Sequence, residues 1–173
     1  MNLNEVYFYT ASILQWKHLL KPDKYKQVIL DSLVHLVREK KMVVYGFVIM
    51  PNHIHIILEM IAMNGKELPH ESFMKFTGHQ FLKDLQTNHP AVLAYFLVNQ
   101  KHRTHQFWQR DALPVWLYTQ KACEQKLDYI HLNPLQEHWN LASRPEDYPW
   151  SSAAFYELGE DRFAFLTHYK ERF

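Results

Sequence analysis

The sequence predicts an α+β sandwich in which helices pack on an antiparallel sheet. Strand-like and helix-like segments alternate along the chain, and two of the strand-like segments are joined by a Pro-Asn turn that favours a hairpin. Apolar residues make up 47% of the 173 residues, which is sufficient for a sizeable core. No segment has the composition of a flexible linker or repeats at a fixed period, so we expect one domain over residues 1–173.

The expected elements follow in order from the amino-terminus. Aromatic and β-favouring residues predict a strand at Val6–Ser12. Apolar residues at helical spacing then predict a helix over 24–40, and strands over 42–50 and His53–Met60 come next. Residues 89–97 fit either a helix or a strand. The later elements are a helix over 71–85 with Phe73, Phe76, Phe81 and Leu85 in the core, a short strand over 113–117, and a helix over 119–132 that Pro134 ends or bends.

Composition narrows the class of protein without naming a partner. The formal net charge of +1 neither supports nor excludes nucleic acid, because binding depends on where the charge lies. Cys123 is the single cysteine, which rules out an internal disulfide and suits a reducing cytosol. The amino-terminus lacks the pattern of a secretory signal, and the most apolar stretch is interrupted by polar residues, so we expect a cytoplasmic protein with no membrane partner.

Two histidines stand one residue apart in the strand expected at His53–Met60. Alternate side chains of a strand point to the same face, so His53 and His55 project together while Ile54 and Ile56 point the other way. Two imidazoles held close together are a good beginning for a metal site. The alternative is that both rings hydrogen-bond to neighbours and bind nothing.

A tyrosine and an asparagine lie four residues apart in a helical segment. Tyr129 and Asn133 therefore share a face of the helix. A phenol that attacks a phosphate forms a covalent phosphotyrosine, and a metal on the phosphate stabilises the charge that develops. Asn133 would add an oxygen ligand to the same metal. The alternatives are that Tyr129 is a packing residue and that Asn133, which precedes Pro134, only ends the helix.

These two segments resemble a known family. Met-Pro-Asn-His-Ile-His-Ile-Ile at 50–57, followed by Tyr-Ile-His-Leu-Asn-Pro at 129–134, resembles the single-tyrosine HUH transposases. More closely, it resembles their REP-associated tyrosine transposase branch, also described as IS200-like. Phe-Trp-Gln-Arg at 107–110 and Asp-Tyr-Pro-Trp-Ser-Ser-Ala at 147–153 resemble two further elements of that family. Four short elements in the same order are more specific than any one of them.

The resemblance implies a ferredoxin-like sandwich, an antiparallel sheet with helices on one face, that is the HUH fold. It implies that His53 and His55 bind Mg²⁺ or Mn²⁺, with Asn133 as the third ligand and Tyr129 as the nucleophile. It also implies cleavage of single-stranded DNA, which leaves a 5′-phosphotyrosine and a free 3′-hydroxyl that later rejoins strands. Relatives often recognise a DNA hairpin beside the cleavage site. Some relatives are dimers that exchange the tyrosine helix, and others work alone, so a homodimer is one assembly that the resemblance implies.

Positive charge and an aromatic ring come together in residues 101–110. Cations neutralise phosphates, and an aromatic ring stacks on an unpaired base. The alternative is a solvated basic loop around a core tryptophan. The chain departs from the family after this segment, with Asp-Ala-Leu-Pro-Val-Trp-Leu at 111–117, which bears on DNA contacts more than on chemistry. The candidate DNA-binding residues are Lys75, Lys101, Arg103, Trp108, Gln109 and Arg110.

Two competing functions stay open at this point. His-Ile-His-Ile-Ile at 53–57 begins like the signature of a histidine-triad nucleotide hydrolase, but that signature needs a third histidine where this chain has Ile57. A DNA-binding module without cleavage is the other alternative, although every proposed catalytic position is filled.

Overall fold

The computed structural model describes residues 1–100, 103–109 and 114–173. Its main sheet has four antiparallel strands in the order β2-β3-β1-β6. With α1 after β1 and α2 after β3, this is the β-α-β-β-α-β order of a ferredoxin-like sandwich, so the predicted fold class is confirmed. The elements that build it are β1 (Val6–Ser12), α1 (Asp23–Arg38), β2 (Met42–Ile49), β3 (His53–Met60), α2 (Pro69–Asn88), β6 (Val115–Trp116) and α4 (Gln120–Leu132).

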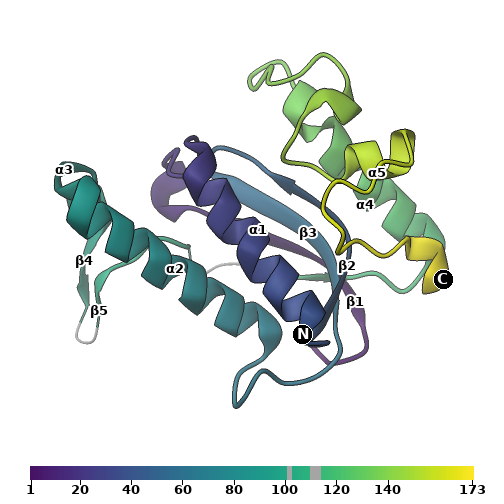
Figure 1. The fold of residues 1–173 in the computed structure, drawn as a ribbon, viewed down its shortest axis with the longest axis horizontal. Coiled ribbons are helices and arrows are strands. Elements are labelled where there is room, and N and C mark those ends of the chain that lie inside the picture. Colours follow the sequence, from purple (N-terminus) through teal and green to yellow (C-terminus); the bar gives the residue numbers. More distant parts are fainter. Residues whose placement is uncertain (101–102, 110–113) are drawn as a thin grey trace.

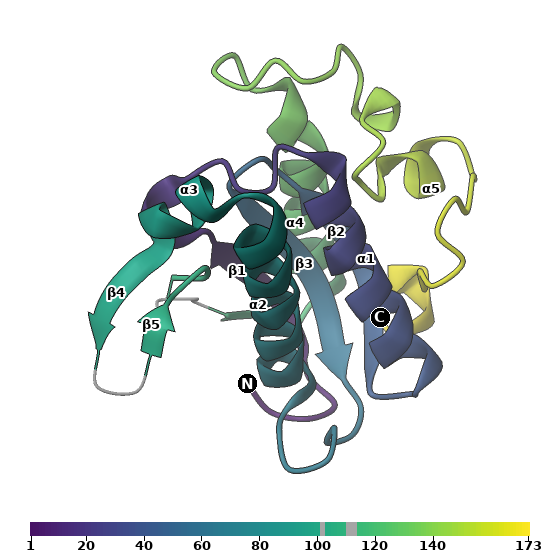
Figure 2. The ribbon, with the colours of Figure 1, turned by 60° about the vertical axis from the view of Figure 1, so that its left-hand side comes forward.

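Both faces of the sheet are covered. Ile54, Ile56 and Leu58 of β3 pack with α1 and α2 in the larger core cluster. Ile57, on the other face of β3, packs with Leu127 of α4 in a second cluster. Figure 2 shows α1 and α2 in front of the strands and α4 behind them. The helices α1 and α2 thus share one face as expected, and α4 adds a layer over the face that carries the two histidines.

A close approach between β2 and α4 holds that second layer. The β2 strand shifts register between Val44 and Gly46, where it pairs with β3. A Cβ at Gly46 would lie 2.5 Å from Leu127 Cδ2 and 3.3 Å from Ile130 Cδ1. The absence of a side chain at Gly46 therefore lets α4 lie directly against the sheet. The amino-terminus of α4 is capped by Thr119, whose hydroxyl accepts a hydrogen bond of 3.2 Å from Ala122 N.

Helix α2 begins two residues before the predicted start and contacts the core through one stripe. Phe73, Thr77, Phe81 and Leu85 are buried, and each is four residues from the next. Phe76 lies off this stripe and is 46% exposed, so its predicted place in the core is wrong. Residues 89–97 contain a short helix, a turn and the start of a strand, which is why their sequence pattern favoured neither.

The rest of the chain lies at the edges of the sandwich (Figure 1). A two-stranded hairpin projects beside the far end of α2, and a short helix packs near the carboxyl-terminus. The hairpin consists of β4 (Leu97–Gln100) and β5 (Arg103–His105), and the short helix is α5 (Ala153–Glu157). Another short helix, α3 (Pro90–Leu93), follows α2 along the chain. Within the described part of the chain, every helix is too short or too polar to cross a membrane.

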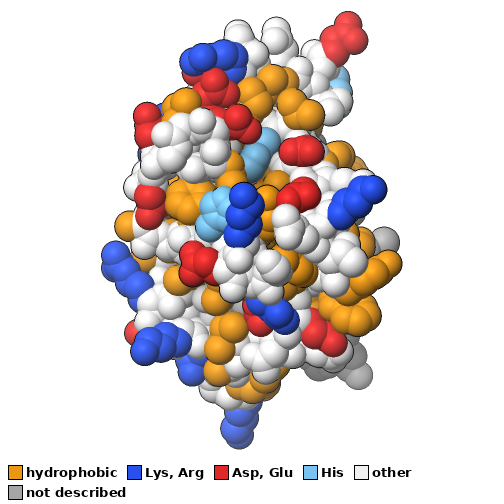
Figure 3. All heavy atoms as spheres, turned by 90° about the vertical axis from the view of Figure 1, so that its right-hand side faces the viewer, with side chains coloured by type: hydrophobic (Ala, Val, Ile, Leu, Met, Phe, Trp, Pro, Cys, Tyr) orange, Lys and Arg blue, Asp and Glu red, His pale blue; other side chains and the backbone are white. Residues whose placement is uncertain are grey.

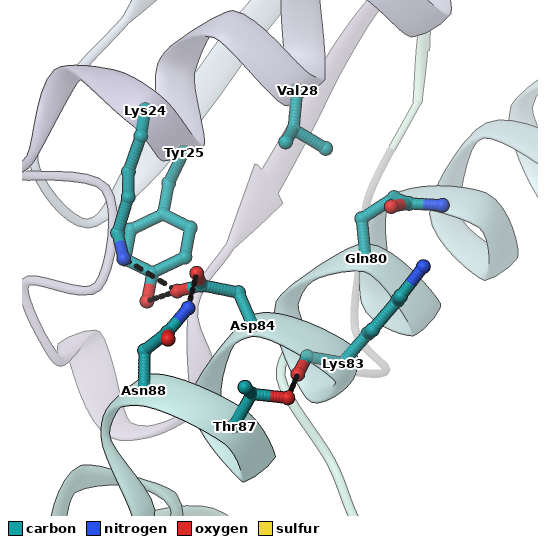
Figure 4. A pocket seen from close by; sticks show the side chains of 8 residues that line it. All are labelled: Lys24, Tyr25, Val28, Gln80, Lys83, Asp84, Thr87 and Asn88. Atoms are coloured by element: carbon teal, nitrogen blue, oxygen red, sulfur yellow. Dashed lines mark hydrogen bonds and ion pairs between the residues drawn. The ribbon is translucent and has the colours of Figure 1, made fainter.

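An open cavity of about 350 Å³ lies between α1 and α2, and polar contacts join the two helices beside it (Figure 4). The Asp84 carboxylate accepts hydrogen bonds of 2.6 Å from Lys24 Nζ, 2.6 Å from Tyr25 Oη and 2.7 Å from Asn88 Nδ2. These groups satisfy one another and join the two helices beside the cavity.

Candidate active site

The two histidines lie side by side on β3. Their ring centroids are 4.7 Å apart, and the side chains of His53 and His55 are 6% and 5% exposed. The Nδ1 atom of His53 lies 2.6 Å from Asn52 Oδ1, and the Nδ1 atom of His55 lies 2.8 Å from Thr10 Oγ1. Each ring that donates its Nδ1 proton in this way keeps the Nε2 lone pair available, which is the usual arrangement of a metal-binding histidine.

Burial keeps both rings neutral at neutral pH. Removal from water lowers the pKa of His53 to about 4, and the nearby His138 acts in the same direction. Burial lowers the pKa of His55 to about 3, with further contributions from His53 and Lys126. A metal ligand must be deprotonated, so these two imidazoles are in the state that metal binding requires.

Helix α4 brings Tyr129 to the same place. The Tyr129 ring centroid lies 5.3 Å from that of His55 and 6.0 Å from that of Phe8. Phe8 stacks on His55 at 5.1 Å, so the three rings are in mutual contact. Tyr129 is 46% exposed, which leaves the phenol accessible to a ligand. Residues far apart in the sequence thus converge within a single chain.

Asn133 lies where α4 ends. Its side chain is buried, and its Oδ1 atom makes no hydrogen bond with any described residue. A buried amide oxygen without a partner is costly, and such groups are rare in folded proteins. An oxygen of this kind fits a hard divalent cation. Over the described ranges no group of three or more His, Cys, Asp and Glu side chains is placed to hold a metal, and the Asn133 amide oxygen is a ligand of another type.

Lys126 is a part of the site that the sequence analysis missed. Its Nζ atom lies 4.6 Å from the Phe8 ring centroid and 5.6 Å from the Tyr129 ring centroid. Among the described residues Lys126 forms no ion pair, and its Nζ atom lies over these two rings. Lys126 is three residues before Tyr129 on α4, and this i, i+3 spacing was the signal that could have found it. Figure 3 shows the face with α4 and the carboxyl-terminal segment, where histidine side chains lie beside a basic side chain and among hydrophobic ones.

Lys75, Trp108 and Gln109, the predicted DNA-binding residues whose side chains the structure describes, do not join this cluster. Trp108 is 6% exposed, its Nε1 donates a 2.9 Å hydrogen bond to Thr77 Oγ1, and its ring lies near Phe73 and Phe81. The predicted stacking role of Trp108 is therefore wrong, because its ring is an anchor in the core beneath α2. Gln109 is partly buried, and its Nε2 lies 3.4 Å from Ile13 O.

Of the basic residues in that set, Lys75 lies away from the histidines and two others lie outside the described residues. Lys75 is exposed on α2, on the opposite face of the sheet from α4, and forms a 2.9 Å ion pair with Glu67. With Gln109 it borders a groove of about 610 Å³ between α2 and residues 104–109. Arg103 lies in β5. Lys101 and Arg110 lie outside the described residues.

No protein-family model matches this chain, and no curated protein matches it by sequence. Among solved structures, the chain is similar to a REP-associated tyrosine transposase bound to a REP hairpin, with a TM-score of 0.59 and 18% identity over 87% of this chain and 78% of that one. The chain therefore shares the fold of that transposase.

Proposed function

We propose that this protein is a metal-dependent single-stranded DNA endonuclease and strand transferase with Tyr129 as its nucleophile. One observation carries the proposal: the exposed phenol of Tyr129 lies against His55, which is itself paired with His53. A tyrosine that served only the core would be buried, and a structural histidine pair would not need an accessible phenol beside it.

The residues that would hold the metal are His53 and His55 through Nε2, and Asn133 through Oδ1. A mixed nitrogen and oxygen set suits Mn²⁺ or Mg²⁺. The ion would polarise the phosphate oxygens and stabilise the charge that develops there. Two observations support the fit of these residues to a divalent ion: both imidazoles are neutral, and the Asn133 Oδ1 atom has no hydrogen-bond partner among the described residues.

The reaction itself is an exchange of one phosphate ester for another. The Tyr129 Oη atom would bond to the phosphorus and lose its proton, while the bond from phosphorus to the 3′-oxygen breaks and that oxygen gains a proton. The products are a 5′-phosphotyrosine and a free 3′-hydroxyl. Attack of a 3′-hydroxyl on the phosphotyrosine reverses the exchange and joins strands, so no external energy source is needed.

Lys126 would neutralise the negative charge that gathers between the phenol and the phosphate. Lys126→Ala should slow adduct formation about tenfold or more, the scale on which a positioned charge contributes to a transition state. Affinity for Mn²⁺ should not fall, because no metal ligand is touched and a positive charge near the site is removed. Single-turnover rates with single-stranded DNA provide the measurement. Lys121→Ala, on the exposed side of the same helix, is the matched control, and equal rates for the two variants would show that Lys126 has no part in the reaction.

Single-stranded DNA that carries a hairpin is the partner we propose, since a transposase of the same fold has been solved with a REP hairpin. Convergence of Tyr129 and the histidines within one chain also means that a monomer would hold a complete site.

The experiment that tests this function uses single-stranded DNA with a hairpin, labelled at the 3′ end, and Mn²⁺. We expect a protein–DNA adduct that survives denaturation and is absent when EDTA replaces the metal. A protein that only binds DNA would shift the label in a native gel and form no adduct. A nucleotide hydrolase would turn over a nucleoside phosphoramidate in place of the DNA.

A further inference from the structure

Two tryptophans border His53. Trp16 belongs to the 3₁₀ turn Leu14–Trp16 that follows β1, and Trp139 lies in the segment after α4. The ring centroid of each lies 6.0 Å from that of His53. The histidine pair is thus flanked by the phenol of Tyr129 next to His55 and by two indoles next to His53.

Trp16 is displayed to solvent in a strained conformation. Trp16 is 54% exposed, although contact between the apolar surface of an indole ring and water is unfavourable. Its φ is +56°, and Gln15 before it has a φ of +55°. Bulky residues rarely adopt this left-handed region, and residues held there cluster at ligand-binding and catalytic sites. Backbone strain of this kind in two successive residues, ending on an exposed ring, is consistent with a role in binding.

Asn52 fixes this ring in relation to the histidine pair. Its buried side chain accepts from His53 Nδ1 at 2.6 Å through Oδ1 and donates to Trp16 O at 3.2 Å through Nδ2. One amide therefore orients both the imidazole and the turn that carries Trp16. A hydrogen bond of 2.8 Å from Trp16 N to Ile13 O closes the turn.

Trp139 is partly buried and is surrounded by imidazoles. Its ring centroid lies 5.7 Å from that of His18 and 5.3 Å from that of His138, both of which are exposed. The turn that carries it is held by hydrogen bonds of 2.8 Å from Trp139 N to Gln136 O and 2.9 Å from Leu141 N to Pro134 O. Trp139 also packs against the second hydrophobic cluster, so the core holds its ring in place beside His53.

We propose that Trp16 and Trp139 form a subsite that stacks on an unpaired base of the DNA strand next to the phosphate that Tyr129 attacks. The proposal rests on the proposed function. Every base has a flat π surface, so stacking on indole accepts any sequence but requires that the base be free of a duplex. A base held beside His53 would place its own phosphate toward the histidine pair. The subsite would therefore select single strands at the point of cleavage.

Binding measurements on the uncleaving Tyr129→Phe background test this subsite. The probe is a fluorescein-labelled single-stranded oligonucleotide of mixed sequence in the presence of Mn²⁺, followed by fluorescence anisotropy. Adding Trp16→Ala or Trp139→Ala should weaken binding about tenfold, within the range measured for loss of one stacked base. Trp16→Phe and Trp139→Phe should recover most of the affinity, which separates stacking from a folding defect.

Trp116→Ala is the matched control, because Trp116 is 53% exposed but lies on β6, with its ring beside Tyr118. Removal of single bases along the probe adds a second test. One abasic position should weaken binding to the protein with both indoles and have no effect on the Trp16→Ala, Trp139→Ala double variant. Equal affinities for the Trp16→Ala, Trp139→Ala and Trp116→Ala proteins would overturn the subsite.

The two proposals fail separately. If the unsubstituted protein forms no adduct but Trp16→Ala still weakens binding to single strands, cleavage is refuted and the subsite stands. If the adduct forms at the same rate and the probe binds equally well with and without both indoles, the subsite is refuted and the proposed function stands.

Discussion

The Tyr129→Phe protein will form no covalent adduct with single-stranded DNA, while binding the DNA about as well as the unsubstituted protein. The change removes one oxygen and keeps the ring that contacts Phe8 and His55. The fold should therefore be unaffected. We expect adduct formation to fall by more than about a thousandfold, the scale of loss when an enzyme's nucleophile is removed. Denaturing gels with labelled DNA measure the adduct, and anisotropy measures the binding.

Tyr118→Phe is the control for this experiment. Tyr118 is 72% exposed, so it is even more accessible to DNA than Tyr129, but its ring lies beside Trp116 and not beside a histidine. Its substitution should leave adduct formation unchanged. Persistence of the adduct in Tyr129→Phe, or its loss in Tyr118→Phe, would assign the nucleophile to another residue.

The second large effect is expected from His55→Ala, which removes one metal ligand. Affinity for Mn²⁺ should fall by more than about a hundredfold, because even the loss of a group that only orients a metal ligand costs 10–100-fold. Adduct formation should fall with it and should recover in part at high Mn²⁺, which restores occupancy of the weakened site. Titration followed by the electron paramagnetic resonance signal of free Mn²⁺ gives the affinity directly, in the absence of DNA.

His131→Ala controls for the loss of a buried imidazole. His131 is as buried as His55, and burial lowers its pKa to about 4, but its Nε2 pairs with Ser152 Oγ at 2.9 Å. This variant should be less stable, because Ser152 loses a partner in the core, and yet bind Mn²⁺ normally. If His55→Ala and His131→Ala bind Mn²⁺ with the same affinity as the unsubstituted protein, the histidine pair is not a metal site.

Local patterns in the sequence were enough to place the chemical groups. Strand alternation predicted that His53 and His55 lie on one face of a strand. Helical spacing predicted that Tyr129 and Asn133 share a face of a helix. Both inferences depend only on periodicity, which the backbone imposes whatever the tertiary structure. The contact between the sheet and α4 is different. It depends on the close approach of α4 to Gly46 of β2, which no short motif encodes.

The surroundings of the site could not be derived in the same way. Asn52 and Thr10 support the two imidazoles through contacts that depend on strand register and on the path of the chain after β1. For Trp108, a residue that was predicted to be at the surface is buried. Its basic neighbours in the sequence suggested a surface role, but the packing of residues 104–109 against α2 turned its ring into the core. Neighbouring charge in a sequence says little about which way an aromatic ring points.

Trp16 illustrates how strain escapes a sequence pattern. Nothing in Leu-Gln-Trp at 14–16 predicts two successive left-handed residues, since glycine and asparagine are the usual signals for that conformation. Only the folded chain, with Asn52 holding the turn, shows that the indole is placed beside His53.

The most direct test of the account is to identify the residue that carries the DNA. The adduct formed with single-stranded DNA and Mn²⁺ would be digested with nuclease and protease, and the modified peptide sequenced by mass spectrometry. We predict a nucleotide joined through its 5′-phosphate to Tyr129, with no modification in the metal-free sample. A nucleotide on any other residue, or a 3′-linkage, would contradict the convergence of one phenol and two imidazoles as the basis of catalysis.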